Sequence, residues 1–64
     1  MNLVSGEIIE IFIEDGTAVA RVSVRGAQMK VSLMFLPEAR TGDTILVESG
    51  VAISRVQLEK IKEN

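Results

Sequence analysis

The stretch of sequence that decides the fold is Gly42-Asp43-Thr44-Ile45-Leu46-Val47-Glu48-Ser49-Gly50-Val51-Ala52-Ile53. Its first two residues are a turn signal, and the run from Ile45 to Val47 is short, apolar and rich in β-branched residues, which is typical of a buried strand. Gly50 interrupts this pattern, and a glycine inside a strand pattern indicates a bulge or the close approach of another backbone. We therefore expect a strand over 44–49 that bends at Gly50 and continues over 51–54 around the corner of a small barrel.

Upstream, apolar and polar residues alternate with the period of a half-buried strand. In the first such segment, 7–14, the alternation places three residues on one face: Ile9, Ile11 and Ile13. Ile8 falls on the opposite face, with Glu10. The Asp15-Gly16 pair that follows is a strong hairpin signal, because a type I′ turn needs positive φ at both central positions and these residue types supply it at low cost.

Two more alternating segments, 17–25 and 28–33, predict the second and third strands, with a turn at Gly26-Ala27 between them. Their inward-facing residues are expected to be Ala18, Ala20, Val22, Val24, Met29, Val31 and Leu33. Small alanines suit the interior of a tightly curved barrel. Pro37 then ends any ladder, and 38–41 is expected to be a surface loop leading to Gly42-Asp43.

The tail from Ser54 to Asn64 has a different period. Leu58 and Ile61 are three residues apart among charged neighbours, which fits one short amphipathic helix. A helix of this length is not stable alone, so we expect it to dock on the barrel or on a partner. Together these patterns predict one all-β domain over 1–64, a small five-stranded OB-like β-barrel with a short C-terminal α-helix.

Composition limits the functions open to this chain. Its 64 residues are 47% hydrophobic and 25% charged, as in a packed globular domain, and a chain so short builds only a small core that self-association would supplement. Seven basic and nine acidic residues give a net charge of −2, which provides no electrostatic footprint for nucleic acid or for an anionic membrane. No export signal and no apolar run long enough to cross a membrane is found, so a cytoplasmic location is expected.

Catalysis and metal binding are not expected. The sequence contains no cysteine and no histidine, which removes the commonest general base and the usual soft or borderline metal ligands. The serines therefore have no histidine to activate them, and a serine triad cannot be assembled. Glu10 and Glu14 lie on one predicted strand face, but such a pair is more typical of a solvated surface than of an acid–base site. We predict that the protein is not an enzyme and holds no metal or cofactor.

Binding functions remain. An OB-like barrel that binds nucleic acid combines a basic groove with aromatic platforms, whereas this chain has only Phe12 and Phe35, and Phe35 lies in an apolar run where a core position is expected. For protein binding, the candidate contact residues are the apolar lead Leu3 and Val4 together with Val51. The same three residues could equally close the ends of a small core.

Several short pieces of the chain, in their order and spacing, resemble one known family. They are Gly6-Glu7-Ile8, Ala20-Arg21-Val22 followed by Gly26, Val31-Ser32-Leu33 with Leu36-Pro37, and the frame from Gly42 to Ile53. The resemblance is to the hydrogenase assembly chaperone family, HypC/HupF. It covers most of the chain from Gly6 to about Gln57.

The resemblance implies an OB-like barrel with a C-terminal helix that acts in assembling the nickel–iron hydrogenase centre. Such chaperones bind a scaffold maturation protein, help to carry iron with its cyanide and carbonyl ligands, and deliver it to the large-subunit precursor. The family's chemistry rests on a cysteine directly after the initiator methionine and on a histidine within the frame. In this sequence Asn2 and Glu48 stand at those positions, so ligation of iron by the usual groups is not expected.

Without the metal ligands, the resemblance implies that contact with a protein partner is what remains. The residues that we expect to form this contact are Asn2, Leu3, Glu48, Gly50, Val51 and Ala52. The partner implied is a hydrogenase large-subunit precursor or the scaffold maturation protein. The alternative is an OB-like binding module for an unrelated protein or a nucleic-acid ligand.

Overall fold

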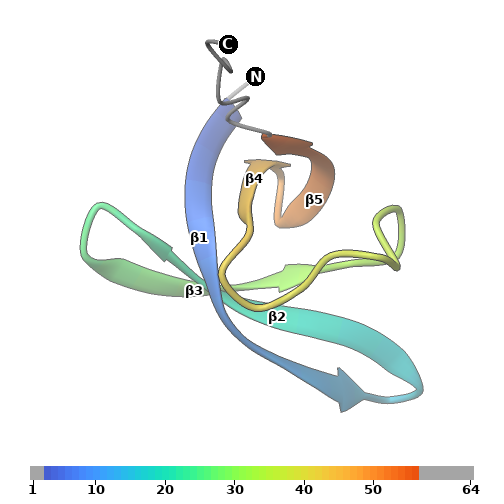
Figure 1. The fold of residues 1–64 in the computed structure, drawn as a ribbon. Helices are drawn as coiled ribbons and strands as arrows, with labels where there is room; N and C mark the ends of the chain where they lie inside the picture. The colour runs from blue at the N-terminus through green and yellow to red at the C-terminus, as the bar shows by residue number, and fades with distance from the viewer. Residues whose placement is uncertain (1–2, 57–64) are drawn as a thin grey trace, which may run out of the picture.

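A computed structural model describes residues 3–56 of the chain, and these residues form five β-strands. The strands are β1 (Leu3–Glu14), β2 (Thr17–Val24), β3 (Ala27–Ser32), β4 (Thr44–Glu48) and β5 (Val51–Val56). They close into a barrel in the order β1-β2-β3-β5-β4, because the long, curved β1 pairs with β4 in its first part and with β2 in its second (Figure 1). The predicted five-stranded all-β barrel is confirmed. The predicted C-terminal helix falls almost entirely beyond residue 56, outside the described residues, and 54–56 belong to β5.

Three hairpins are closed by two-residue turns in which both residues have positive φ. The φ angles are 51° and 78° at Asp15-Gly16, 51° and 87° at Arg25-Gly26, and 54° and 77° at Ser49-Gly50. These turns match the right-handed twist of the flanking strands, and glycine adopts the second position at no steric cost. The prediction for Asp15-Gly16 is confirmed, and the second turn lies one residue earlier than predicted.

The predicted bend of one strand at Gly50 is wrong. The chain reverses direction there, and Glu48 and Val51 face each other across an antiparallel hairpin. The irregularity in this region lies further along the chain, because Val47 pairs with Ala52 and Leu46 with Ser54, which leaves Ile53 as an extra residue. A glycine after a residue that tolerates positive φ is a hairpin signal as well as a bulge signal, and here the hairpin forms.

The predicted faces of the first strand are wrong at Ile8 and Ile9, whereas Ile11 does pack against the core. Ile8 pairs with Val22 and Glu10 with Arg21, so Ile9 is an extra residue that shifts the alternation by one position. Ile8 is therefore buried, with 1% of its surface exposed, whereas Ile9 is 42% and Ile13 68% exposed. The strand also begins at Leu3, four residues before the predicted start, because the lead pairs with β4.

The barrel core is formed by inward-facing residues of all five strands and of the loop after β3. Its buried members are Ile8, Ala20, Val22, Val31, Leu33, Leu36, Ala39, Ile45, Val47 and Ala52. Ala18, Val24 and Met29 pack against it, so the predicted inward faces of the second and third strands are confirmed. Gly6 is buried where β1 crosses β2, and a Cβ there would lie 2.5 Å from Val22 Cγ1, which explains the absence of a side chain.

The core position expected for Phe35 is wrong, because 64% of its surface is exposed. Two successive turns follow β3, in which Leu36 N–H donates to Leu33 O and Ala39 N–H donates to Leu36 O. This spacing of three residues turns Leu33, Leu36 and Ala39 towards the core. Phe35 falls between the inward positions and points outward.

Candidate partner-binding surface

Leu3, Glu48 and Val51 lie side by side on three adjacent strands. Leu3 is the Cα partner of Glu48 in the β1–β4 ladder, and Glu48 is the partner of Val51 in the β4–β5 ladder. Their neighbours Val47 and Ala52 are buried in the core, and side chains alternate between the two faces of a strand. Leu3, Glu48 and Val51, which we call the rim row, therefore share the outer face of the barrel.

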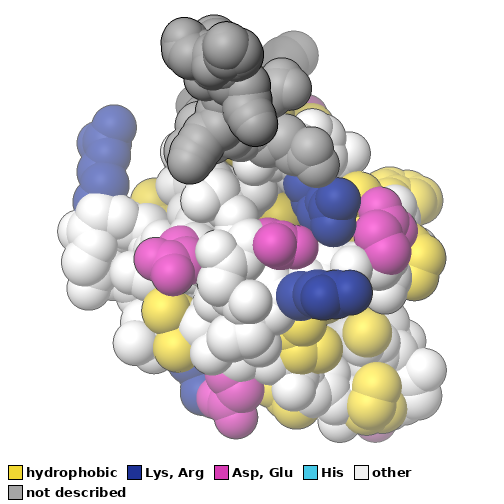
Figure 2. Space-filling view, viewed as in Figure 1, with side chains coloured by type: hydrophobic (Ala, Val, Ile, Leu, Met, Phe, Trp, Pro, Cys, Tyr) yellow, Lys and Arg dark blue, Asp and Glu magenta, His cyan; other side chains and the backbone are white. Residues whose placement is uncertain are grey.

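Two of the three residues of the rim row are apolar. Leu3 is 53% exposed, and Val4, which follows it in β1, and Ile53 of β5 also expose part of their side chains. Glu48 is half-buried between the two apolar members, and no described cation forms an ion pair with it. In Figure 2, apolar and charged side chains are interspersed over the visible face of the barrel. An apolar pair flanking one carboxylate is suited to contact with a protein surface rather than with a small anion.

The other predicted contact residues differ in what they offer. Gly50 lies in the turn that joins Glu48 to Val51, and its carbonyl oxygen accepts a hydrogen bond of 2.9 Å from Ser32 N–H. Ala52 is fully buried, so its side chain belongs to the core rather than to the surface. Asn2 lies outside the described residues. The structure thus brings together Leu3, Glu48, Gly50 and Val51 and places the Ala52 side chain on the opposite face of β5.

The residues around Glu48 do not fit an iron fragment that is held by a thiolate and an imidazole. The chain contains neither cysteine nor histidine. Within residues 3–56, no three carboxylates gather into a group that could hold a metal ion. A single carboxylate offers only hard oxygen ligands, whereas an iron fragment that is held by a thiolate and an imidazole prefers softer ligands.

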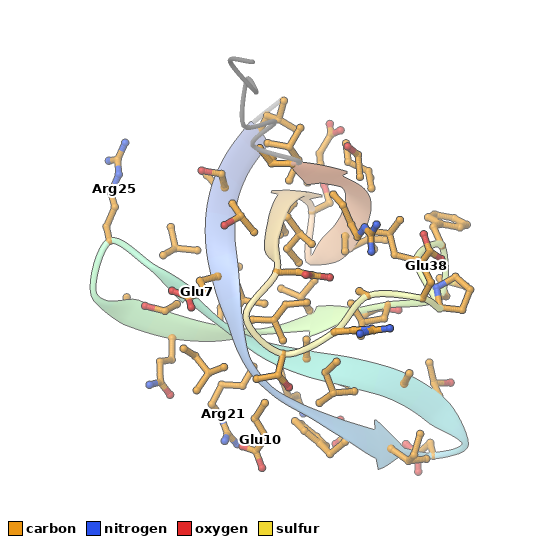
Figure 3. All side chains as sticks on the ribbon, viewed as in Figure 1. Glu7, Glu10, Arg21, Arg25 and Glu38 are labelled. Atoms are coloured by element: carbon orange, nitrogen blue, oxygen red, sulfur yellow. The ribbon has the colours of Figure 1, made fainter. Side chains whose placement is uncertain are left out.

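The outer face of β1, β2 and β3 carries ion pairs. Arg21 pairs with Glu10, as Figure 3 shows, and Lys30 Nζ lies 2.9 Å from Glu14 Oε1. The Arg21 guanidinium also lies over the ring of Phe12, 5.6 Å from its centroid. Glu10 and Glu14 thus interact with different cations, and one face of the Phe12 ring is already occupied by a side chain of the same sheet.

No pocket occurs among the residues that the structure describes. Over the same range, 3–56, no helix is long and apolar enough to cross a membrane. The candidate site is therefore a surface rather than a cavity.

Sequence reasoning found the members of the rim row but not the pairing that aligns them. Leu3 and Glu48 are 45 positions apart, and nothing local in either segment signals the β1–β4 ladder. Sequence reasoning also missed the exposure of Met34 and Phe35 in the loop after β3. The signal for the latter was Pro37, which ends strand alternation, so that period two no longer applies around it.

Comparison with known proteins adds one match. The model of the HupF/HypC family matches residues 4–64, which includes all but the first residue of β1 and the whole frame from Gly42 to Ile53. No curated protein matches the chain.

Proposed function

Because the chain belongs to the HupF/HypC family, we propose that it is a hydrogenase maturation chaperone that works by protein–protein contact without ligating iron itself. The observation that carries the general role is the family match over residues 4–64. A role in assembly rather than in catalysis is the one that this family performs. The strand order β1-β2-β3-β5-β4 supports the OB-like form of barrel expected for it.

The partner surface of this proposal is centred on the rim row. Leu3 and Val51 supply apolar contact area, and Glu48 lies between them where the family carries its histidine. Two more residues complete the proposed contact. Gly50 lies between Glu48 and Val51 in the sequence, and Asn2 directly precedes Leu3. The partner is the scaffold maturation protein or the precursor of the hydrogenase large subunit.

Contact without iron ligation rests on the chemistry of the positions that the family uses. Glu48 replaces an imidazole by a carboxylate, and Asn2 replaces a thiolate by an amide. Neither replacement supplies a ligand that suits an iron centre carrying cyanide and carbonyl groups. The chain therefore holds a partner, and any iron is bound by that partner.

Anaerobic co-purification from the native cell extract tests this function, with the tagged chain as bait and iron measured in the eluate. The proposal expects a scaffold maturation protein or a large-subunit precursor in the eluate, and iron in proportion to that partner rather than to the bait. Iron in proportion to the bait in the absence of either partner would contradict it. Recovery of neither protein would contradict the maturation role itself.

A further inference from the structure

Strand β3 is paired along one edge and almost unpaired along the other. On one side it pairs with β2 from Ala27 to Ser32, but on the other side it meets β5 at a single position, Ser32 opposite Val51. Within residues 3–56, no strand covers the outer edge from Ala27 to Val31. Figure 1 shows the reason, since the β2–β3 hairpin extends away from β4 and β5 beyond the barrel wall.

The alternation of the ladder identifies the backbone groups that are free. Ser32 N–H points away from β2 and donates to Gly50 O at 2.9 Å. Successive residues of a strand direct their N–H and C=O groups to opposite sides. Lys30 and Gln28, two and four residues earlier, therefore also point these groups away from β2. No described backbone group bonds to them there, so two donors and two acceptors are presented in one line.

The hairpin that carries this edge is basic. From Thr17 to Ser32 there is no acidic residue, whereas Arg21, Arg25 and Lys30 are all cationic. Arg21 and Lys30 are paired with carboxylates of β1, but none of the ion pairs of the described residues includes Arg25, which extends from the turn away from the barrel (Figure 3). Arg25, in the turn at the end of the edge, is thus the cation of this hairpin that is left to attract an acidic side chain, and no carboxylate of the hairpin itself competes for it.

The two faces of the edge differ in polarity. Gln28 and Lys30 are exposed on the outer face, whereas Met29 is half-buried and Val31 is buried on the inner face. A strand laid against this edge would place alternate side chains beside Lys30 and beside Met29. Acidic residues suit the first set of positions and apolar residues suit the second.

We propose that the outer edge of β3 binds an extended segment of a protein partner, in which acidic and apolar residues alternate, as an added strand of the sheet. The edge begins at Ser32, directly opposite Val51 of the rim row, so such a segment would continue the rim row's surface. A second copy of this chain is a poorer occupant, because pairing two β3 edges would bring two basic hairpins together. This inference rests on the geometry and charge of β3 and does not depend on the family's role in maturation.

The test uses two substitutions of one residue. Gln28→Pro removes the free N–H while breaking no bond of the β2–β3 ladder, because proline is compatible with an edge position whose N–H faces solvent. Gln28→Ala removes the side chain but keeps that N–H and serves as the matched control. The probe is a synthetic ten-residue peptide in which Glu alternates with Val, and a peptide with Lys in place of Glu tests the charge.

Amide exchange and chemical shifts of the ¹⁵N-labelled chain report binding. At millimolar concentrations of the Glu–Val peptide, we expect amide exchange at Gln28 and Lys30 to slow at least tenfold. Exchange at Met29 and Val31, which are already bonded to β2, should change little. Gln28→Pro should weaken binding at least tenfold and Gln28→Ala less than twofold. The Lys–Val peptide should bind at least tenfold more weakly to the unaltered chain, a comparison that does not depend on how well Gln28→Pro folds.

Three results would overturn the proposal. The first is an absence of change at Gln28 and Lys30. The second is equal binding of the two peptides. The third is protection of both amides from exchange in the free chain. Protection that persists on dilution would mean that the chain's own residues cover the edge. Protection that disappears on dilution would mean that a second copy of the chain covers it. None of these results would affect binding of a maturation partner through the rim row.

Discussion

Leu3 and Glu48 are directly opposite each other in the β1–β4 ladder, with both side chains on the outer face of the barrel. Leu3 is thereby held beside Glu48, which by the resemblance stands where the HupF/HypC family carries a histidine. Asn2, which by the same resemblance stands where the family carries a cysteine, directly precedes Leu3 in sequence. The pairing thus places the first described residue of β1 next to the carboxylate on which the proposed contact is centred.

Leu3→Asp should weaken binding of the maturation partner at least tenfold, or about 1.4 kcal/mol. The substitution removes exposed apolar area and places a second carboxylate opposite Glu48. Ile13→Asp makes the same change at the far end of β1, where the side chain is even more exposed, and should leave affinity unchanged. Titration calorimetry measures the affinity of each variant for the maturation partner. An equal loss of affinity in the two variants would contradict the placement of the surface.

Gly6→Ala should lower the free energy of unfolding by about 1–3 kcal/mol. The added Cβ would lie 2.5 Å from Val22 Cγ1 and 2.7 Å from Ser23 O, so β1 and β2 must move apart. Urea unfolding followed by circular dichroism measures the change. Ser5→Ala, at the exposed neighbouring position, is the control and should alter stability by less than about 0.5 kcal/mol.

Ile8→Val should lower stability by about 0.5–1.5 kcal/mol, because Ile8 is buried in the core. The same substitution at Ile9 should have almost no effect, since Ile9 is the extra, exposed residue of the bulge. Thermal unfolding of the two single variants gives the comparison. A larger loss for Ile9→Val would mean that the strand alternates without a bulge.

Asp43→Ala should cost about 1 kcal/mol of stability. Asp43 Oδ2 accepts a hydrogen bond of 2.9 Å from Arg40 N–H and lies 3.6 Å from Arg55 Nη1, so the carboxylate fixes the loop that leads into β4. Arg55→Ala should cost less, because it removes only the partly exposed ion pair. Denaturant midpoints of the two variants show which one loses more stability. A larger loss for Arg55→Ala than for Asp43→Ala would show that the ion pair dominates.

Local patterns predicted much of this fold. Asp15-Gly16 is a turn signal that depends only on two residues, and the alternation of β2 and β3 is unbroken, so their inward faces were predicted correctly. Ile9 and Ile53 each add one residue to a strand, and a single extra residue puts the alternation before it out of phase with the alternation after it, without leaving a compositional signal. Phe35 was misplaced because turns, not strand alternation, govern its segment.

The candidate site was predictable in part for the same reason. The frame that contains Glu48 and Val51 is local and could be identified from sequence. Its alignment with Leu3 and the exposed edge of β3 both depend on pairing between distant strands, which no short window of sequence contains. The absence of acidic residues from Thr17 to Ser32 is a signal in the sequence, but its meaning depends on knowing that the hairpin leaves the barrel wall.

We propose that this chain binds its maturation partner by surface contact without ligating iron. Anaerobic titration of the metal-free chain with purified, iron-free scaffold maturation protein tests it most directly. We expect saturable one-to-one binding whose affinity changes less than twofold when the scaffold carries iron. Binding that occurs only with iron present, or no binding to either form of the scaffold or to the large-subunit precursor, would contradict it.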